Sequence, residues 1–187
     1  MEKQILKLTC NDFISVNHYM GYRAVGRRVM AYKPKETKDF EKAFGNYIKQ
    51  EMNNQNWVKP SKGKFIIMDT VFYFPRVDMD AQNYFKSMCD IMTDSGVWED
   101  DNIVCERVNR IYYDSKNPRI EIVIYESNTV GIFDTVQEYE LFKETCNKCT
   151  RFKKTCSIHN KALESRIQDE ISIVEGKWTC NKFKQTK

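Results

Sequence analysis

Residues 65–93 read FIIMDTVFYFPRVDMDAQNYFKSMCDIMT and join a strand pattern to a helix pattern. The run at 65–74 is rich in β-branched and aromatic residues and stops at a proline, which is typical of a strand. Over residues 80–93 the apolar side chains recur at helical spacing, with polar side chains on the opposite side. Asp80 stands where an N-cap would, and Gly96 ends the pattern. This part of the chain therefore predicts a strand that leads into an amphipathic helix.

The flanking residues predict further elements of the same kind. Ile5 to Leu8 indicates a short strand, and residues 11–28 indicate a mobile basic loop. Apolar residues at three-to-four-residue spacing predict a second amphipathic helix over 40–52. The β-rich runs 103–113 and 120–125, joined by a turn, predict a hairpin. The expected fold class is α+β.

The composition is that of a folded globular protein. The chain has 187 residues with 41% hydrophobic residues, enough to fill a core in one domain or in one domain with a small appendage. No run approaches the roughly 20 apolar residues of a membrane span. The first ten residues lack the apolar block of a signal peptide. We expect a soluble, cytoplasmic protein without a membrane anchor.

Charge is distributed unevenly, although the net value is only +4. Both ends of the chain are basic and the centre is acidic. One interpretation is ordinary solvated surface. The other is a protein that binds a polyanion and holds cations with its acidic cluster.

Five aspartates form the acidic cluster: Asp78, Asp80, Asp90, Asp100 and Asp101. Phosphodiester hydrolysis commonly uses oxygen ligands that hold Mg²⁺ or Mn²⁺ and leave positions for phosphate and water. Asp78 and Asp80 are two residues apart, so on an extended segment their carboxylates would point the same way. Composition and spacing alone still favour solvated surface for such a cluster.

The run VDMDAQNYFKSMCDIMTDSGVWEDDNIV, residues 77–104, resembles the signature of the RusA family of Holliday junction resolvases. The family pattern is Asp-x-Asp-Asn-x2-Lys, a helix, Gly-Val-Trp and an Asp-Asp pair. The matching residues here are Asp80, Gln82, Asn83, Lys86, Gly96, Val97, Trp98, Asp100 and Asp101. The segment Ser15-Val16-Asn17-His18-Tyr19 is similar to the family's N-terminal Ser-x-Asn-x-Tyr segment. The resemblance covers residues 1–126.

The resemblance implies a small mixed sheet with packed helices and a homodimeric, Mg²⁺-dependent (or Mn²⁺-dependent) endonuclease that cuts four-way DNA junctions. It implies that Asp80 and Asp101 are catalytic metal ligands and that Lys86 is the catalytic lysine, with Asp78 and Asp100 as further candidate ligands. One position departs from the family, because the second Asp of the pattern is Gln82. Either Asp78 or Asp90 compensates, or the centre binds metal weakly, or the chain is a non-cleaving junction-binding or scaffolding protein.

The basic N-terminal segment predicts DNA contact. Arginines and lysines alternate there with Tyr22 and Tyr32, a combination suited to phosphate neutralisation and base stacking. The candidate DNA-binding residues are Asn17, Arg23, Arg27, Arg28, Lys33 and Lys35. The alternative interpretation of this basic segment is a flexible solvated loop.

Four of the seven cysteines gather near the end of the chain. The spacing Cys146-x2-Cys149-x6-Cys156, with His159 and Cys180 beyond, supplies five candidates for a structural Zn²⁺ that needs four ligands. Cys180 is the preferred fourth ligand and His159 the substitute. Buried free thiols are the alternative.

The sequence thus predicts a nuclease domain over 1–126, a connector over 127–144 and a zinc module over 145–187. Within the module we expect a helix over 161–173 and a short strand around 178–180. The basic residues Lys148, Arg151, Lys153 and Lys154 suit either a second DNA contact or the docking of a protein partner.

Overall fold

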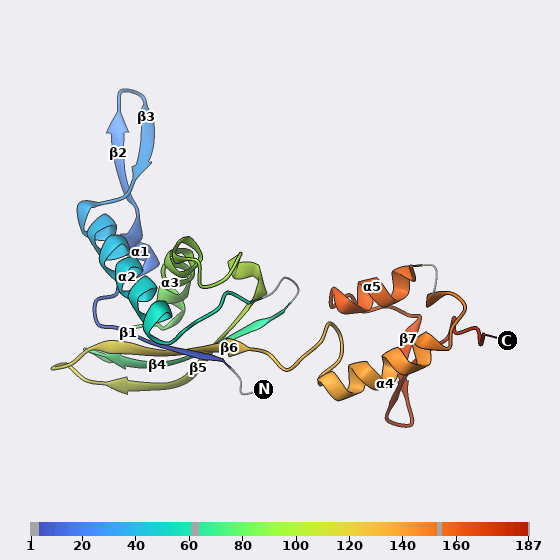
Figure 1. Ribbon diagram of the computed structural model, residues 1–187. Helices are drawn as coiled ribbons and strands as arrows, with labels where there is room; N and C mark the ends of the chain where they lie inside the picture. The colour runs from blue at the N-terminus through green and yellow to red at the C-terminus, as the bar shows by residue number, and fades with distance from the viewer. Residues whose placement is uncertain (1–3, 61–63, 153–154, 187) are drawn as a thin grey trace. The chain divides into compact units, whose positions relative to one another are not determined.

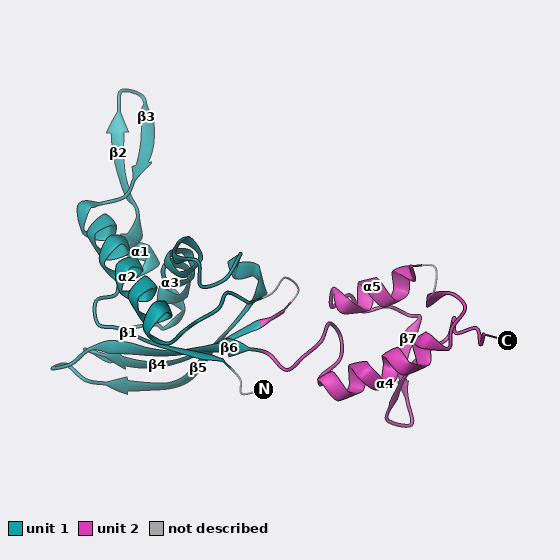
Figure 2. Cartoon of the chain, in the orientation of Figure 1, with its two compact units in different colours: residues 1–62, 66–126 teal, residues 63–65, 127–187 magenta. Residues whose placement is uncertain are grey.

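The computed structural model describes residues 4–60, 64–152 and 155–186. The chain forms two compact units, residues 1–62 with 66–126 and residues 63–65 with 127–187 (Figure 2). No helix in the described part of the chain has the length and hydrophobicity needed to span a bilayer.

The first unit is built on a four-stranded mixed sheet in the order β1-β6-β4-β5. The strands are β1 (Ile5–Cys10), β4 (Ile66–Phe74), β5 (Val104–Tyr113) and β6 (Arg119–Glu126). Helices α2 (Lys35–Asn54) and α3 (Gln82–Ser95) lie on one face of this sheet (Figure 1). The α+β class and the mixed sheet with packed helices are therefore confirmed, as are the strand at 65–74 and both amphipathic helices.

The hairpin prediction for residues 103–125 is wrong. β5 and β6 run antiparallel, but β4 lies between them, pairing with β5 in parallel and with β6 antiparallel. β4 is the most apolar strand, and its core-facing side chains, such as Phe72 and Phe74, are fully buried. Such a strand gains most from a central position with a neighbour on each side.

Residues 11–28, predicted as a mobile loop, instead contain regular secondary structure. It contains the short helix α1 (Val16–Tyr19) and strand β2 (Gly21–Val25), which pairs with β3 (Arg28–Tyr32). The two strands form a ribbon that projects from its unit (Figure 1). Gly26 at the turn has φ 61°, a conformation that favours glycine.

The second unit contains α4 (Val136–Asn147), α5 (Ser157–Leu163) and the hairpin of β7 (Ile171–Val174) with β8 (Lys177–Cys180). Its buried cluster is small and consists of Phe133, Phe142, Ala162 and Ile171. Gly131 has φ 59°, and a Cβ there would lie 2.0 Å from the Ala162 carbonyl oxygen, so only glycine fits.

Two expectations for this unit differ from the structure. The segment 127–144, expected as a connector, carries most of α4 and supplies Phe133 and Phe142 to the core. The helix expected over 161–173 ends at Leu163, and Ile171 begins a strand. Its apolar spacing was ambiguous because each element here is shorter than two helical turns or five strand residues.

Candidate functional site

Helix α3 separates a buried face from a polar face. Tyr84, Phe85 and Met88 pack into the core, while Lys86 stays exposed on the opposite side. The helix begins after Ala81, one residue later than predicted, and the Asp80 Oδ1 accepts a hydrogen bond from the Gln82 N–H at 3.0 Å. Asp80 therefore caps the turn before α3 and is fixed at the start of its polar face.

After α3 ends, residues 96–101 turn back and run beside the helix. Gly96 ends the helix with φ 86°, and Trp98 is buried with its indole N–H donating to Thr93 Oγ1 at 2.8 Å. The Asp100 Oδ1 then accepts from the Asn102 N–H at 3.0 Å and opens the short 3₁₀ helix η1 (Asp101–Ile103). The anchored Trp98 and the cap together place Asp101 beside α3.

Lys86 joins the two halves of the predicted motif. Its Nζ lies 2.7 Å from Asp90 Oδ1 and 3.1 Å from Asp101 Oδ2. The hydrogen bonds that the Lys86 ammonium donates to Asp90 and then to Asp101 raise its pKa. Lys86 is therefore a fixed cation at neutral pH, although 66% of its side chain is exposed.

Asp78 and Asp80 line a separate polar cleft of about 430 Å³. Asn83 and Asn17 line it too, and Arg76 Nε pairs with Asp78 Oδ1 at 2.9 Å. Sequence reasoning missed Arg76, although a basic residue two positions before an aspartate on an extended segment was a usable signal. It also missed a second lining residue, Thr37, whose hydroxyl is buried without a partner among the described residues.

The structure thus brings Lys86 to Asp101 and brings Asp78, Asp80, Asn17 and Asn83 around one cleft. It does not gather the acids further, because the described residues include no group of three or more His, Cys, Asp or Glu side chains poised to hold a metal ion.

A family model for RusA endodeoxyribonucleases matches residues 15–125. The chain belongs to the RusA family. Members act on branched DNA and are usually dimeric. The match confirms the predicted resemblance over the first unit and gives no support to the non-cleaving alternative. Among curated proteins, none matches the chain.

Within the RusA-family part, the β2–β3 ribbon carries the basic residues predicted to contact DNA. Arg23, Arg27 and Arg28 are exposed on it, and Arg23 lies over the Tyr32 ring at 5.6 Å. Lys33 is more constrained, because it pairs with Glu41 and sits 5.1 Å from the Tyr19 ring centre. Lys35 is exposed at the first turn of α2.

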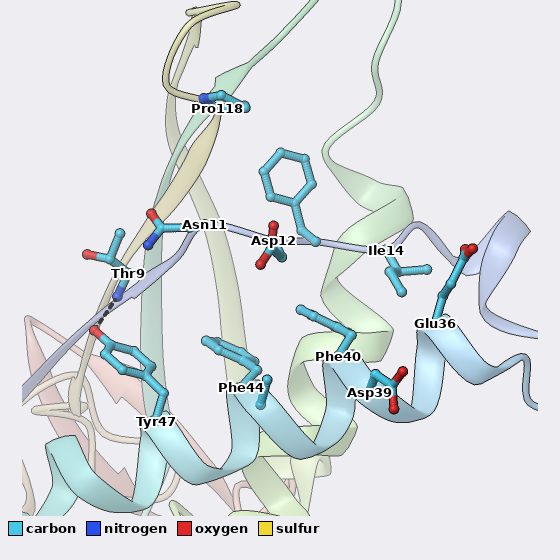
Figure 3. Close-up of a pocket in the computed structure, with 12 residues that line it drawn as sticks. Thr9, Asn11, Asp12, Ile14, Glu36, Asp39, Phe40, Phe44, Tyr47 and Pro118 are labelled. Atoms are coloured by element: carbon cyan, nitrogen blue, oxygen red, sulfur yellow. Dashed lines mark hydrogen bonds between the residues drawn. The ribbon is translucent and has the colours of Figure 1, made fainter.

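Another groove of this RusA-family unit lies against helix α2. It has a volume of about 880 Å³ and is floored by Phe40, Phe44 and Tyr47 of α2 (Figure 3). Three carboxylates line it, those of Asp12, Glu36 and Asp39. The groove is therefore acidic as well as apolar.

The cysteine cluster lies in the second unit, outside the family match. All five predicted zinc ligands line one small cavity of about 20 Å³: Cys146, Cys149, Cys156, His159 and Cys180. Burial, followed by the neighbouring thiols, raises the pKa of Cys146 to about 12. Among the described residues, these side chains are not positioned as a group that could bind a metal ion.

The Cys149 sulfur and the His159 Nε2, two potential ligand atoms of this cavity, differ in their hydrogen bonding. Burial raises the pKa of the Cys149 thiol, but backbone N–H donors from Lys184, Arg151 and Phe152 outweigh it and lower that pKa. The Lys184 N–H lies 3.4 Å from the Cys149 sulfur. His159 is 7% exposed, and its Nε2 is buried without a hydrogen-bond partner in the described part of the chain.

Proposed function

We propose that this chain is a Mg²⁺-dependent or Mn²⁺-dependent endonuclease that resolves Holliday junctions and related branched DNA by phosphodiester hydrolysis. The observation that carries the proposal is the Lys86 ammonium held against Asp101 across the turn that follows α3. This contact joins the lysine and the Asp-Asp pair of the RusA motif, inside the matched region.

Carboxylate and amide oxygens, the donors available around α3, are the ligand type that a hard divalent cation prefers. Asp80 and Asp101 would hold it, with Asp78, Gln82 and Asp100 as further donors. Asp80 and Asp100 each use Oδ1 to accept a backbone N–H, and within the described residues their Oδ2 atoms have no partner. When bound, the ion would polarise the phosphodiester and lower the pKa of a bound water.

Lys86 has a role that follows from its charge. Because Asp90 and Asp101 raise its pKa, the Lys86 side chain is protonated at neutral pH. A fixed cation stabilises the negative charge that develops on the phosphate. Gln82 contributes a neutral oxygen and no charge, so the remaining carboxylates must neutralise the cation.

DNA would be held by positively charged side chains of the first unit. Arg23, Arg27 and Arg28 on the projecting ribbon, with Lys33, Lys35 and Asn17 near its base, would position the phosphate backbone rather than read its sequence. We propose a homodimer as the active form, because a two-fold axis matches two symmetric cuts in a four-way junction.

The experiment is a substrate panel. Purified protein is incubated with a four-way junction, a replication fork, a flap and a linear duplex, in Mg²⁺, in Mn²⁺ and in EDTA. We expect paired nicks in the junction that require the metal, and little cutting of the duplex. Tight junction binding without nicking in either metal would contradict the proposal and select a non-cleaving binding protein.

We also propose that the second unit holds a structural Zn²⁺ through Cys146, Cys149, Cys156 and Cys180. Thiolates at Cx2C spacing are preferred zinc ligands, and the N–H donors at Cys149 stabilise a thiolate. The unpartnered Nε2 of His159 makes that residue the alternative fourth ligand. A closed four-ligand site leaves no position for a reacting water, so its role is structural.

Elemental analysis and Co²⁺ substitution test the zinc site. We expect one zinc per chain and the absorption bands of tetrahedral thiolate-bound cobalt. Cys180→Ser and His159→Gln are then compared, and the variant that changes the cobalt spectrum identifies the fourth ligand. A purified chain that contains no zinc and gives no cobalt spectrum would contradict this part of the proposal.

A further inference from the structure

Two segments of the second unit that are distant in sequence lie side by side. The loop after α4 pairs with the C-terminal segment, since the Thr150 N–H donates to the Lys184 carbonyl and the Thr186 N–H to the Lys148 carbonyl, both at 2.8 Å. Cys149 and Gln185 form a β-bridge. We call the four cations on these two segments the knuckle surface: Lys148, Arg151, Lys182 and Lys184. Of these, Arg151 and Lys182 also line the cysteine cavity.

The knuckle surface carries uncompensated positive charge. All four side chains belong to exposed residues, and none of them forms an ion pair with another described residue. Two other cations of the same unit are paired, Lys143 with Glu140 at 3.4 Å and Arg166 with Glu164 at 3.0 Å, whereas Lys161 and Lys177 have no ion pair within the described residues but lie on other segments. Unpaired cations grouped on one surface attract a polyanion.

The backbone beneath these cations is fixed. Cys149 is buried, and its sulfur accepts the Lys184 N–H, so the two segments are tied at the point where their side chains emerge. A fixed backbone reduces the entropy lost when the lysines and the arginine contact a ligand. This favours a ligand with regularly placed negative groups.

We propose that the knuckle surface binds the phosphate backbone of DNA and gives the chain a second, sequence-independent contact with its substrate. The proposal takes DNA as the ligand from the proposed function of the first unit. Two linked contacts raise affinity beyond that of either one. Lys153 and Lys154, predicted to belong to the same basic loop, lie outside the described residues.

The test compares two variants of equal charge change in the full-length protein. Lys182→Gln with Lys184→Gln removes two cations from the knuckle surface, and Lys161→Gln with Lys177→Gln removes two exposed cations of the same unit that lie outside it. Binding to a fluorescent four-way junction is measured by anisotropy across a series of salt concentrations, without added Mg²⁺ or Mn²⁺ and without a chelator, so that the proposed structural zinc is retained. Circular dichroism verifies that each variant is folded.

The knuckle variant should bind about fivefold to tenfold more weakly, and the slope of log affinity against log salt should fall by about 2, since each phosphate contact contributes about 0.9. The control variant should bind like the wild type. Equal losses in both variants, or unchanged DNA binding in the knuckle variant, would overturn the proposal, and the second result would leave the surface to a protein partner. Because no Mg²⁺ or Mn²⁺ is added, the result does not depend on whether the chain cuts DNA.

Discussion

The two units of the chain differ most in how much apolar surface each one buries. The first unit packs two long helices against one face of a four-stranded sheet, with Phe72, Met88 and Trp98 almost fully buried. The second unit buries a cluster of four residues around Phe133. A core that small rarely stabilises a fold by itself. Five potential metal ligands surround one cavity there. We therefore infer that the second unit needs a bound metal ion to fold, whereas the first unit folds without one.

The strongest test of this difference removes the metal ligands. Cys146→Ser with Cys149→Ser should unfold the second unit, because apparent zinc-binding free energies of about 10–16 kcal/mol also stabilise the fold. Limited proteolysis should then cut after residue 126 and leave the first unit intact. Cys105→Ser, at an exposed thiol of β5, is the control. A second unit that stays resistant to protease in the double variant would contradict the inference that it needs metal to fold.

A core truncation examines the other side of the comparison. Phe72→Ala should destabilise the first unit by about 3–5 kcal/mol, because the side chain is fully buried and leaves a cavity. Urea unfolding followed by fluorescence measures the change, and the zinc content should stay at the wild-type level. Val77→Ala, at a 74% exposed position of the same unit, should change little. A loss of zinc in Phe72→Ala would show that the units are not independent.

The third prediction assigns the chemistry to the first unit. Lys86→Met should slow junction cleavage by about 100-fold, because a cation positioned at the developing charge is removed. Junction affinity in EDTA should change little. Lys49→Met, at an exposed lysine of α2, should cleave like the wild type. Full activity in Lys86→Met would exclude the proposed role of this lysine.

The smallest effect concerns the base of the β2–β3 ribbon. Burial raises the pKa of Glu41, but hydrogen bonds from Lys33 and Tyr19 outweigh it and lower the pKa below 4.5. A carboxylate with a depressed pKa stabilises the fold above its unfolded pKa and loses this contribution as the pH falls through its folded pKa. Glu41→Gln should therefore lower the free energy of unfolding at pH 7 by up to about 1 kcal/mol.

The same variant should converge on the wild type as the pH falls through the depressed folded pKa of Glu41, because the carboxylate of the wild type is then protonated. Urea unfolding at pH 7, 5 and 3.5 measures the difference. A difference that grows on acidification would mean that Glu41 is not held by these two donors.

The comparison also explains which elements could be predicted from the sequence. The strand at 65–74 and helix α3 are long and strongly patterned, so local periodicity identified them. The order of strands was not local information, since β4 separates β5 from β6 although 103–113 and 120–125 are neighbours in the chain. In the second unit, turns such as Gly131 against Ala162 arise from tertiary contacts that periodicity does not show.

The candidate site was predictable in its residues and less so in its arrangement. Lys86 and Asp90 are four residues apart on one helix face, a spacing that allows their ion pair. The approach of Asp101 depends on the buried Trp98 and the turn at Gly96, which the motif suggested but could not position. The cleft that holds Asp78 and Asp80 needs residues from α1 and α2, and contacts between separate elements are not visible in a motif.

The most direct test of the account is the single-turnover rate of junction nicking in Mg²⁺ for the wild type and for Asp101→Asn, at protein concentrations that saturate the DNA. Asp94→Asn, an exposed aspartate of α3 outside the proposed site, is the matched control. The account predicts that Asp101→Asn binds the junction like the wild type and cuts it at least about 100-fold more slowly, whereas the control cuts normally. Nicking by Asp101→Asn at the wild-type rate, or a wild type that binds the junction and never cuts it, would contradict the account.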